Sequence, residues 1–164
     1  MTSETQEATS EARAGLPEEL VASNTFLLKR LGYAAKQKAM GGYEETGVSP
    51  YQYAILALLA EGVRETQGAI ADALGYDRGQ LVGLLDELEE RNLVERQRDP
   101  DDRRRHVVRL TDEGTRALER LRALAARLED EFLAPLDERD RAALHDLLLR
   151  LAAVHEPRAA RRIR

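Results

Sequence analysis

The sequence predicts a mainly α-helical protein that contains a helix-turn-helix followed by a two-stranded β-hairpin. Hydrophobic residues make up 43% of the 164 residues and aromatic residues only 4%. This mixture favours helices over a β-sandwich, whose core needs Val, Ile and aromatic side chains. Apolar residues also recur at helical spacing along most of the chain, whereas between Leu93 and Leu110 they form short β-type runs around a turn. The length indicates one domain.

The N-terminal part is expected to be a tail followed by one long helix. Residues 1–15 show no periodicity and are expected to be a disordered tail. From Pro17 to about Met40 apolar residues recur at helical spacing, which predicts an amphipathic helix. We expect Gly41-Gly42 to end this helix and Tyr43–Val48 to form a loop.

The next segment predicts a buried helix and then a helix-turn-helix. Ser49-Pro50-Tyr51-Gln52 is a capping box that opens a helix through Ala60, apolar nearly all round and therefore buried. Thr66 is expected to cap a short helix, Gln67–Leu74, that stops at Gly75. Asp77 is expected to cap a second helix, from Arg78 to about Arg91. Two helices of this size joined by three residues form a helix-turn-helix.

The C-terminal half predicts a hairpin and two further helices. Residues 93–98 and 105–110 are expected to be strands, and Asp99-Pro100-Asp101-Asp102 between them has turn chemistry. Thr111 caps a helix whose apolar residues repeat with 3-4 spacing, typical of a helix that packs on other helices. Pro135 interrupts it, and Asp137 caps a last amphipathic helix.

A helix, a helix-turn-helix and a hairpin in this order form a winged helix, which is suited to DNA. A helix fits the major groove, and an Arg-bearing hairpin tip reaches the adjacent backbone or minor groove. The formal net charge of −5 argues weakly against polyanion binding. Between Arg91 and Arg105, however, six Arg face four acidic residues, so this segment is locally basic. A second basic cluster closes the sequence at Arg158, Arg161, Arg162 and Arg164.

Two runs resemble the MarR family of bacterial transcription regulators. Residues 99–114, DPDDRRRHVVRLTDEG, look like the wing signature of that family, and residues 85–96, LDELEERNLVER, match the segment before it. The resemblance covers roughly residues 16–156. It implies a homodimer whose first and last helices interlock and whose two winged helices bind a near-palindromic operator. Family members are mostly repressors, often released by small aromatic or phenolic ligands.

The resemblance divides the chain into functional segments. Residues 16–156 are expected to form a MarR-like winged-helix domain between the tail 1–15 and a basic C-terminal tail, 157–164. Within the domain, residues 49–110 are expected to be the DNA-binding core. Residues 16–40 and 111–156 are expected to be dimerisation helices, because they cannot easily bury their apolar stripes in one small subunit.

The hairpin tip carries the first group of expected DNA-binding residues. The family pattern of Asp, any residue, then Arg matches Asp102, Arg103 and Arg104. The resemblance implies that the Asp braces the Arg and that the Arg enters the minor groove, where its permanent charge suits the groove potential. The alternative is a solvated hairpin tip.

The second helix of the helix-turn-helix carries the second group, which comprises Arg78, Gly79, Gln80, Val82 and Gly83. Relatives commonly have a hydroxyl and a basic residue at positions 82 and 83, so this chain departs from the family there. We hypothesise that Arg78 and Gln80 hydrogen-bond base edges, that Val82 touches a thymine methyl, and that Gly83 permits close approach. The alternative is that Gln80 only caps the helix and Arg78 only meets phosphate.

Two further sites are expected. Thr66 and Gln67, at the N-terminus of the first helix of the helix-turn-helix, are candidate phosphate contacts, and simple capping by Thr66 is the alternative role. The resemblance also places an effector pocket near the first helix, the buried helix and the winged helix. Residues there with suitable aromatic or cationic chemistry are Phe26, Arg30, Tyr33, Tyr51 and Tyr53. Core packing is the alternative role for the aromatic ones.

Several function classes are excluded or disfavoured. The absence of Cys excludes disulfides, thiolate nucleophiles, zinc-thiolate sites and thiol redox sensing. His106, His145 and His155 lack metal-ligand spacing, and no catalytic or nucleotide-binding motif occurs, so we expect no enzyme activity, no metal and no cofactor. No apolar run is long enough for a membrane span and no signal peptide is visible, which favours a cytoplasmic protein.

The sequence therefore predicts a ligand-responsive DNA-binding repressor that acts as a homodimer on double-stranded DNA. One alternative is a dimeric adaptor for protein–protein interaction, built on a winged helix that does not bind DNA. The acidic composition and the departure at Val82 and Gly83 are its support.

Overall fold

The computed structural model describes residues 15–62, 65–99 and 106–160, and the chain divides into two compact units, residues 1–37 and 38–164. The described part of the first unit contains α1 (Glu18–Val21) and most of α2 (Asn24–Tyr43). The prediction of one continuous helix from Pro17 is wrong, because the chain leaves the helix at Ala22 and Ser23. The Ser23 hydroxyl accepts a hydrogen bond from the Phe26 N–H (3.3 Å), so this serine starts a new helix.

The prediction that the N-terminal helix ends at Gly41-Gly42 is also wrong. α2 continues through both glycines to Tyr43, which is buried in the core of the second unit. Gly42 lies against Leu128 so closely that a Cβ there would overlap the leucine side chain. A short 3₁₀-helix, η1 (Glu44–Thr46), follows. It ends at Gly47, whose backbone is left-handed, with φ of 66°. Packing thus carries the helix through two residues of low helix propensity.

α3 (Pro50–Leu59) is the central helix of the second unit. The predicted capping box is confirmed: the Ser49 hydroxyl accepts from the Gln52 N–H (3.2 Å), and the Gln52 side chain accepts from the Ser49 N–H (2.8 Å). Ile55 and Leu56 are fully buried, as expected for a helix that is apolar nearly all round.

The predicted helix-turn-helix is confirmed as α4 (Gln67–Leu74) and α5 (Arg78–Glu90). Gly75 ends α4 with φ of 69°, a left-handed conformation that favours glycine. The Tyr76 N–H then donates to the Ala71 carbonyl (3.0 Å), which completes the C-terminal turn of α4. Asp77 caps α5 through the backbone N–H groups of Gly79 and Gln80.

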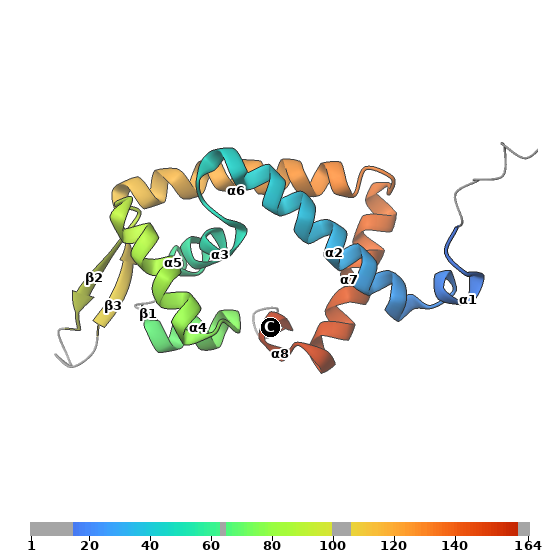
Figure 1. Cartoon of the computed structure of the whole chain (residues 1–164), viewed down its shortest axis with the longest axis horizontal. Coiled ribbons are helices and arrows are strands. Elements are labelled where there is room, and N and C mark those ends of the chain that lie inside the picture. Colours follow the sequence, from blue (N-terminus) through green and yellow to red (C-terminus); the bar gives the residue numbers. More distant parts are fainter. Residues whose placement is uncertain (1–14, 63–64, 100–105, 161–164) are drawn as a thin grey trace, which may run out of the picture. The chain divides into compact units, whose positions relative to one another are not determined.

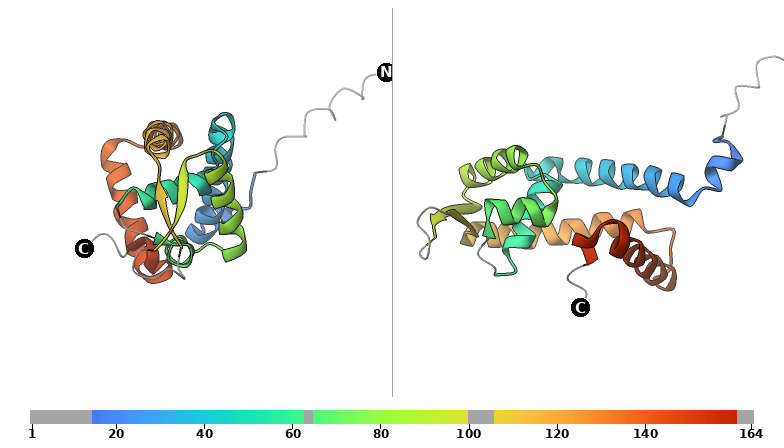
Figure 2. Two further views of the ribbon diagram at one scale, coloured as in Figure 1. Left: turned by 90° about the vertical axis from the view of Figure 1, so that its left-hand side faces the viewer. Right: turned by 90° about the horizontal axis from the view of Figure 1, so that it is seen from below.

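The wing is the antiparallel pair β2 (Val94–Arg98) and β3 (His106–Leu110), which confirms the predicted hairpin strands (Figures 1 and 2). A short strand, β1 (Glu65–Thr66), pairs with the other edge of β3, so the sheet has three strands in the order β1-β3-β2. β1 is not predicted from the sequence, because two residues carry no periodicity.

Three helices complete the second unit: α6 (Asp112–Phe132), α7 (Glu138–His155) and α8 (Pro157–Ala160). The predicted caps Thr111 and Asp137 are confirmed, each by a side-chain bond to a backbone N–H. The first four residues of the expected tail 157–164 form α8, in which Pro157 stands at the first helical position, where proline is favoured.

The core of the second unit lies between α3, α4, α5, the sheet and α6. Its largest fully buried side chains are Ile55, Leu56, Ile70, Leu81, Leu85, Leu88, Val94, Val107, Val108 and Leu118. α7, in contrast, has no buried residue. None of the helices within the described ranges is long and apolar enough to cross a membrane.

Candidate nucleic-acid interface

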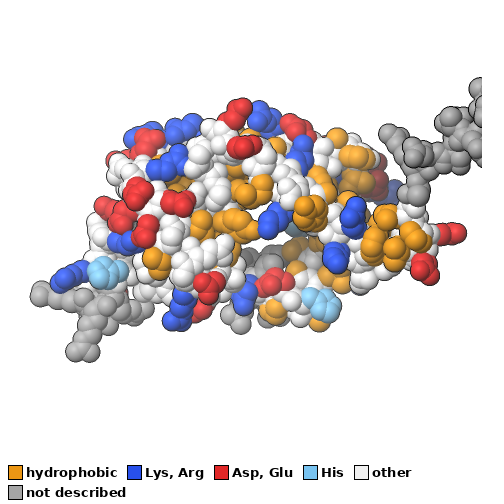
Figure 3. Space-filling view, viewed as in Figure 1, with side chains coloured by type: hydrophobic (Ala, Val, Ile, Leu, Met, Phe, Trp, Pro, Cys, Tyr) orange, Lys and Arg blue, Asp and Glu red, His pale blue; other side chains and the backbone are white. Residues whose placement is uncertain are grey.

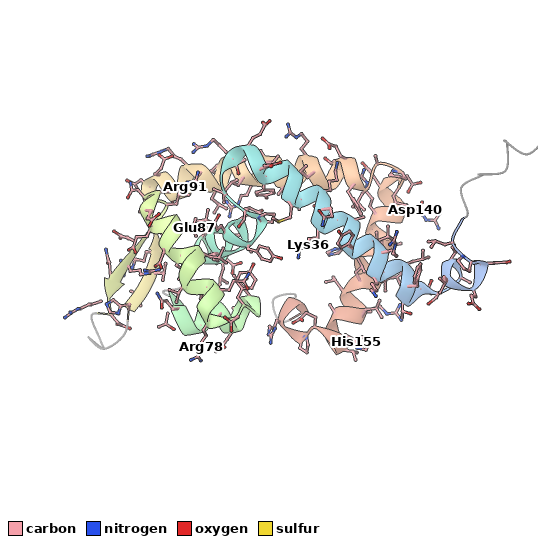
Figure 4. All side chains as sticks on the ribbon, in the orientation of Figure 1. Lys36, Arg78, Glu87, Arg91, Asp140 and His155 are labelled. Atoms are coloured by element: carbon pink, nitrogen blue, oxygen red, sulfur yellow. The ribbon has the colours of Figure 1, made fainter. Side chains whose placement is uncertain are left out.

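One side of the N-terminal half of α5 is exposed and bears one cation and few large side chains, whereas Leu81 on the other side is buried. The five residues of α5 that are predicted to contact DNA are all exposed, and the exposed fraction of Val82 is 41%. They are Arg78, Gly79, Gln80, Val82 and Gly83. A Cβ built at Gly83 would meet no atom within 4 Å, so nothing in the protein itself requires glycine there. Figure 4 shows Arg78 at the lower end of α5, away from Glu87 and Arg91.

The N-terminal cap of α5 is supplied by Asp77. Its carboxylate accepts from the N–H groups of Gly79 (2.8 Å) and Gln80 (3.1 Å). Within the part of the chain that the structure describes, the Gln80 side chain forms no hydrogen bond, and the Arg78 side chain forms no ion pair. Both polar side chains therefore extend into solvent with unused donors.

The C-terminal half of α5 is acidic and attached to its neighbours. Asp86 and Glu89 both pair with Arg96 of the wing strand β2, at 2.6 and 3.2 Å. Glu87 accepts a hydrogen bond from the buried Gln52 side chain of α3 (2.7 Å). In Figure 3 acidic side chains are interspersed with basic ones over this part of the molecule. These contacts connect α5 to both the wing and α3.

Two arginines of the locally basic segment serve the fold. Arg96 is engaged with α5, and the Arg91 guanidinium donates to the backbone carbonyls of Thr46 (3.0 Å) and Gly47 after α2. Arg98, at the end of β2, is exposed. In the sequence these residues form one basic group, and only the fold separates the positioning residues from those that face solvent.

The wing tip itself lies outside the described residues. Asp102, Arg103 and Arg104 are among residues 100–105, so their predicted roles stay predictions. The flanks are described: Arg98 pairs in register with His106, and Gln97 with Val107.

The N-terminus of α4 is capped by its own chain. The Thr66 hydroxyl accepts from the Ala69 N–H (3.2 Å), which confirms capping, and Thr66 also pairs with Val107 of β3. Thr66 and Gln67 are both half-buried. Phosphate contact by these two residues stays a prediction.

The residues predicted for an effector pocket fall into both units. Phe26, Arg30 and Tyr33 belong to the first unit, where Tyr33 is 64% exposed, and Tyr51 and Tyr53 belong to α3 in the second.

Each α3 tyrosine has an aromatic partner within the second unit. The Tyr53 ring lies 5.7 Å from that of Tyr43, and the Tyr51 ring lies 5.7 Å from that of Tyr76, edge to face. The Tyr76 hydroxyl also donates to the Tyr51 carbonyl (3.3 Å). Neither Tyr43 nor Tyr76 is recognisable from the sequence as such a partner, because neither lies at helical spacing from an α3 tyrosine.

Burial and the neighbouring phenol change the acidity of these partners. Burial, with a smaller effect from Tyr53, raises the pKa of Tyr43 to about 12. Burial, with a smaller effect from Tyr51, also raises the pKa of Tyr76. Both phenols are therefore neutral at physiological pH and act as apolar surface with a hydrogen-bonding group.

Within the described residues no group of three or more His, Cys, Asp or Glu side chains could hold a metal ion. An open cavity of about 570 Å³ lies between the end of α3, β3 and the start of α6, lined by side chains that include Leu59, Arg109 and Leu118.

Comparison with known proteins points to one family. A family model described as MarR family matches residues 46–105. A putative transcriptional regulatory protein for the hcr operon of Thauera aromatica is 36% identical over 105 residues, which cover 64% of this chain and 63% of that relative. The chain thus spans less than two thirds of that relative's length.

Solved structures match over a larger share of their chains. The transcriptional repressor CouR, bound to a 23-mer DNA duplex, is 34% identical, with a TM-score of 0.76 over 82% of this chain and 96% of that one. CouR from Rhodococcus jostii RHA1 bound to p-coumaroyl-CoA gives a TM-score of 0.70 at 31% identity, over 83% and 96%. PcaV from Streptomyces coelicolor, with its natural ligand, is 34% identical, with a TM-score of 0.66 over 84% and 96%.

Proposed function

The chain belongs to the MarR family of DNA-binding transcriptional regulators, and on that basis we propose that it is a homodimeric repressor of a near-palindromic operator. The observation that carries this proposal is the exposed N-terminal half of α5, which presents unpaired polar side chains and two glycines on a helix fixed at its other end. A helix presented in this way can enter the major groove with its N-terminus first.

The base contacts are assigned to Arg78 and Gln80. Arg pairs well with the O6 and N7 atoms of guanine, and Gln with N6 and N7 of adenine. Val82 is placed to touch a thymine methyl group, and Gly83 lets the helix backbone approach the DNA closely. The acidic second half of α5 supports this orientation, because those carboxylates would be repelled by phosphates unless that half faced away from the duplex.

The backbone contacts are assigned to the wing and to α4. Arg104, braced by Asp102 and accompanied by Arg103, enters the adjacent minor groove. Thr66 and Gln67 contact a phosphate at the N-terminus of α4, where the helix favours negative charge. Affinity should therefore fall steeply with salt despite the net charge of −5.

Dimerisation is assigned to the helices outside the DNA-binding core 49–110, within a functional domain of residues 16–156. Segments 16–40 and 111–156 carry large exposed apolar side chains, among them Leu31 on α2 and Leu147, Leu148, Leu151 and Val154 on α7. A single subunit leaves these in water, which favours their burial against a second copy. The two half-sites would then lie about 10 bp apart, one turn of B-DNA.

A small aromatic or phenolic effector is proposed to release the repressor. CouR has been solved with p-coumaroyl-CoA and PcaV with its natural ligand, and both resemble this chain over most of their length. Candidate contacts are Phe26, Arg30, Tyr33, Tyr51 and Tyr53, of which the last two present rings on α3. Phenols and aryl carboxylates that change neither the melting temperature nor the DNA affinity would count against this part of the proposal.

The proposal is tested by selecting bound sequences from a random pool of DNA duplexes and measuring affinity by fluorescence anisotropy. Arg78→Ala should reduce the preference for the selected sequence over random DNA, because it removes a base contact worth about 1–3 kcal/mol. Arg104→Ala should weaken binding to both duplexes about equally, since it contacts no base edge that distinguishes them.

Two results would contradict the proposal. Equal effects of both substitutions on selected and random DNA would refute this assignment of base and backbone contacts. A wild-type protein that binds no duplex at low salt would refute the DNA-binding proposal and would favour the adaptor function instead.

A further inference from the structure

Gln52 of α3 is a buried polar side chain whose amide is bonded at both ends. Only 2% of the residue is exposed. Its side-chain oxygen accepts from the Ser49 N–H (2.8 Å), which closes the capping box of α3, and its Nε2 atom donates to the Glu87 carboxylate (2.7 Å). Capping requires only the oxygen, and a glutamate at this position would supply it as well. The amide nitrogen therefore has a separate task, and its partner lies on the helix that we assign to the major groove.

The residue beside Gln52 holds the other end of α5. The Tyr76 hydroxyl donates to the Tyr51 carbonyl (3.3 Å), and the two rings lie 5.7 Å apart, edge to face. Tyr76 directly precedes the N-cap of α5, whereas Glu87 lies near the C-terminal end of that helix (Figure 4). Two adjacent residues of α3 thus hold α5 at its start and near its end. Two such points restrict both the tilt of a helix and its rotation about its own axis.

The rotation of α5 decides where Gln80 points. Gln80 lies seven residues before Glu87, so the two side chains leave the helix within about 20° of each other. A side chain that ends ~6 Å from the helix axis moves by about 1 Å when the helix rotates by about 10°. Hydrogen bonds to base edges form over a range of only about 0.5 Å, so this movement breaks them. The attraction of a cation to phosphates decreases slowly with distance and changes little.

The bond between Gln52 and Glu87 holds α5 without burying a charge. Glu87 is exposed, so its carboxylate stays in contact with water and loses little hydration energy. The Gln52 amide is buried, where loss of its partner would leave a donor unsatisfied. A hydrogen bond to an ionised acceptor is also stronger than one between neutral groups. The contact therefore favours one orientation of α5.

We propose that Gln52 is a positioning residue for sequence recognition. By binding Glu87 it sets the orientation of α5 at which Arg78 and Gln80 reach base edges. This inference rests on the proposed function and adds to it a buried residue that does not itself touch DNA. The competing role is purely structural: the bond only stabilises the fold, and Arg96 with the buried leucines of α5 is sufficient to orient the helix.

The preference for selected over random DNA separates the two roles. Glu87→Leu removes the acceptor and leaves the capping box of α3 intact. It should lower the ratio of the two affinities about three- to tenfold, because the base contacts depend on the orientation of α5. The slope of log affinity against log salt should stay at its wild-type value, since no phosphate contact is lost. Glu87→Gln loses the same charge but keeps an acceptor oxygen, so it should retain most of the preference.

Glu90→Leu is the matched control. It makes the same exchange at an exposed glutamate of α5 that forms no hydrogen bond or ion pair with the residues that the structure describes, and it should keep the wild-type ratio. A wild-type ratio in Glu87→Leu, or equal losses in Glu87→Leu and Glu87→Gln, would overturn the inference and leave the proposed function intact. A wild type that binds no duplex would overturn both.

An exchange of the two side chains gives a second measurement, which decides if Glu87→Leu does not fold. Gln52→Glu keeps a capping oxygen but places a second carboxylate opposite Glu87, so the preference should fall. Combining Gln52→Glu with Glu87→Gln again pairs an amide with a carboxylate and should restore the ratio. A combined variant that is as unselective as Gln52→Glu would overturn the inference.

Discussion

Arg96 is the side chain that ties the wing to α5. Its guanidinium lies between Asp86 (2.6 Å) and Glu89 (3.2 Å), and its backbone N–H donates to Glu89 as well (3.1 Å). Only 21% of the arginine side chain is exposed, so this contact is less screened than an ordinary surface pair. The orientation of α5 relative to the wing therefore depends strongly on this one residue.

Replacing Arg96 by Met should lower the free energy of unfolding by about 1–3 kcal/mol, because two carboxylates then lose a shared charged partner and repel each other. Urea unfolding monitored by circular dichroism measures the change. Arg98→Met, on the same strand but exposed, is the control and should stay within about 0.5 kcal/mol of wild type. Equal losses in the two variants would show that Arg96 does not act through α5.

Tyr43 predicts how stability changes at alkaline pH. Burial raises its pKa to about 12, above the value of 10.0 expected for an unfolded chain. The folded state therefore holds the phenolic proton more tightly, and this stabilisation is complete below pH 10 and is lost as the pH rises through 12. The wild type should lose stability over this window.

Tyr43→Phe removes the titrating group and should make that alkaline loss smaller. Urea midpoints at pH 9, 10 and 11 measure it. Tyr33→Phe, whose side chain is 64% exposed, is the matched control and should follow the wild type. An unchanged pH dependence in Tyr43→Phe would assign the loss to other groups, for example Tyr76, whose pKa is also raised by burial.

As an element, α5 has two halves with different tasks. The second half carries acidic residues that bind Arg96 and Gln52, and three leucines of the helix are buried in the core. Apart from Leu81 and Leu84, the residues of the first half are exposed, and they include Gly79 and Gly83, although glycine destabilises a helix interior. Low propensity at an exposed position, with open space around it, suggests that an external surface approaches there.

Gly83→Ala should therefore have opposite effects on folding and on DNA binding. Since a Cβ at position 83 meets nothing within 4 Å, the protein should become more stable by about 0.5–1 kcal/mol. DNA affinity should fall, because the added methyl group keeps the helix away from the groove. Thermal unfolding and anisotropy titration of the same samples measure both.

Gly41→Ala, in α2 and also with nothing within 4 Å of its Cβ, is the control for this pair of measurements. It should stabilise the protein to a similar extent and leave DNA affinity unchanged. If Gly83→Ala binds the selected DNA as tightly as Gly41→Ala does, the hypothesis that the helix backbone approaches DNA closely at position 83 is wrong.

At the scale of the whole molecule, a single subunit leaves apolar surface unburied. Leu147 and Leu151 of α7 are 53% and 46% exposed, and Val154 is 72% exposed. These positions share one face of the helix, since they are three and four residues apart. A second subunit that covers this face would also place two winged helices on one DNA duplex.

If the proposed homodimer uses this face, Leu151→Glu should leave the protein monomeric, because the interface would then bury an unpaired carboxylate. Light scattering after size-exclusion chromatography measures the mass, and operator affinity should fall with it. Ala153→Glu, which adds the same charge elsewhere on α7, should remain dimeric. Monomeric wild-type protein at micromolar concentration would rule out the homodimer.

Much of the fold could be predicted from local signals. Ser49, Thr66, Asp77, Thr111 and Asp137 were each identified as a helix cap, and each accepts the expected backbone N–H. These signals are reliable because a cap, its turn and the first helical residues lie within four positions of one another. The helix-turn-helix and the wing strands follow from the same short-range chemistry.

The sequence alone was sufficient to predict the order of the main helices and strands, the exposed start of α5 and the family of the protein. The tertiary structure alone decided that α2 passes through Gly41-Gly42, that β1 joins the sheet, and which arginines are engaged. Gly42 against Leu128, Thr66 beside Val107 and Arg158 beside Gly75 are contacts between residues distant in sequence. Periodicity and capping describe only neighbours along the chain, whereas such contacts form only after the elements have packed.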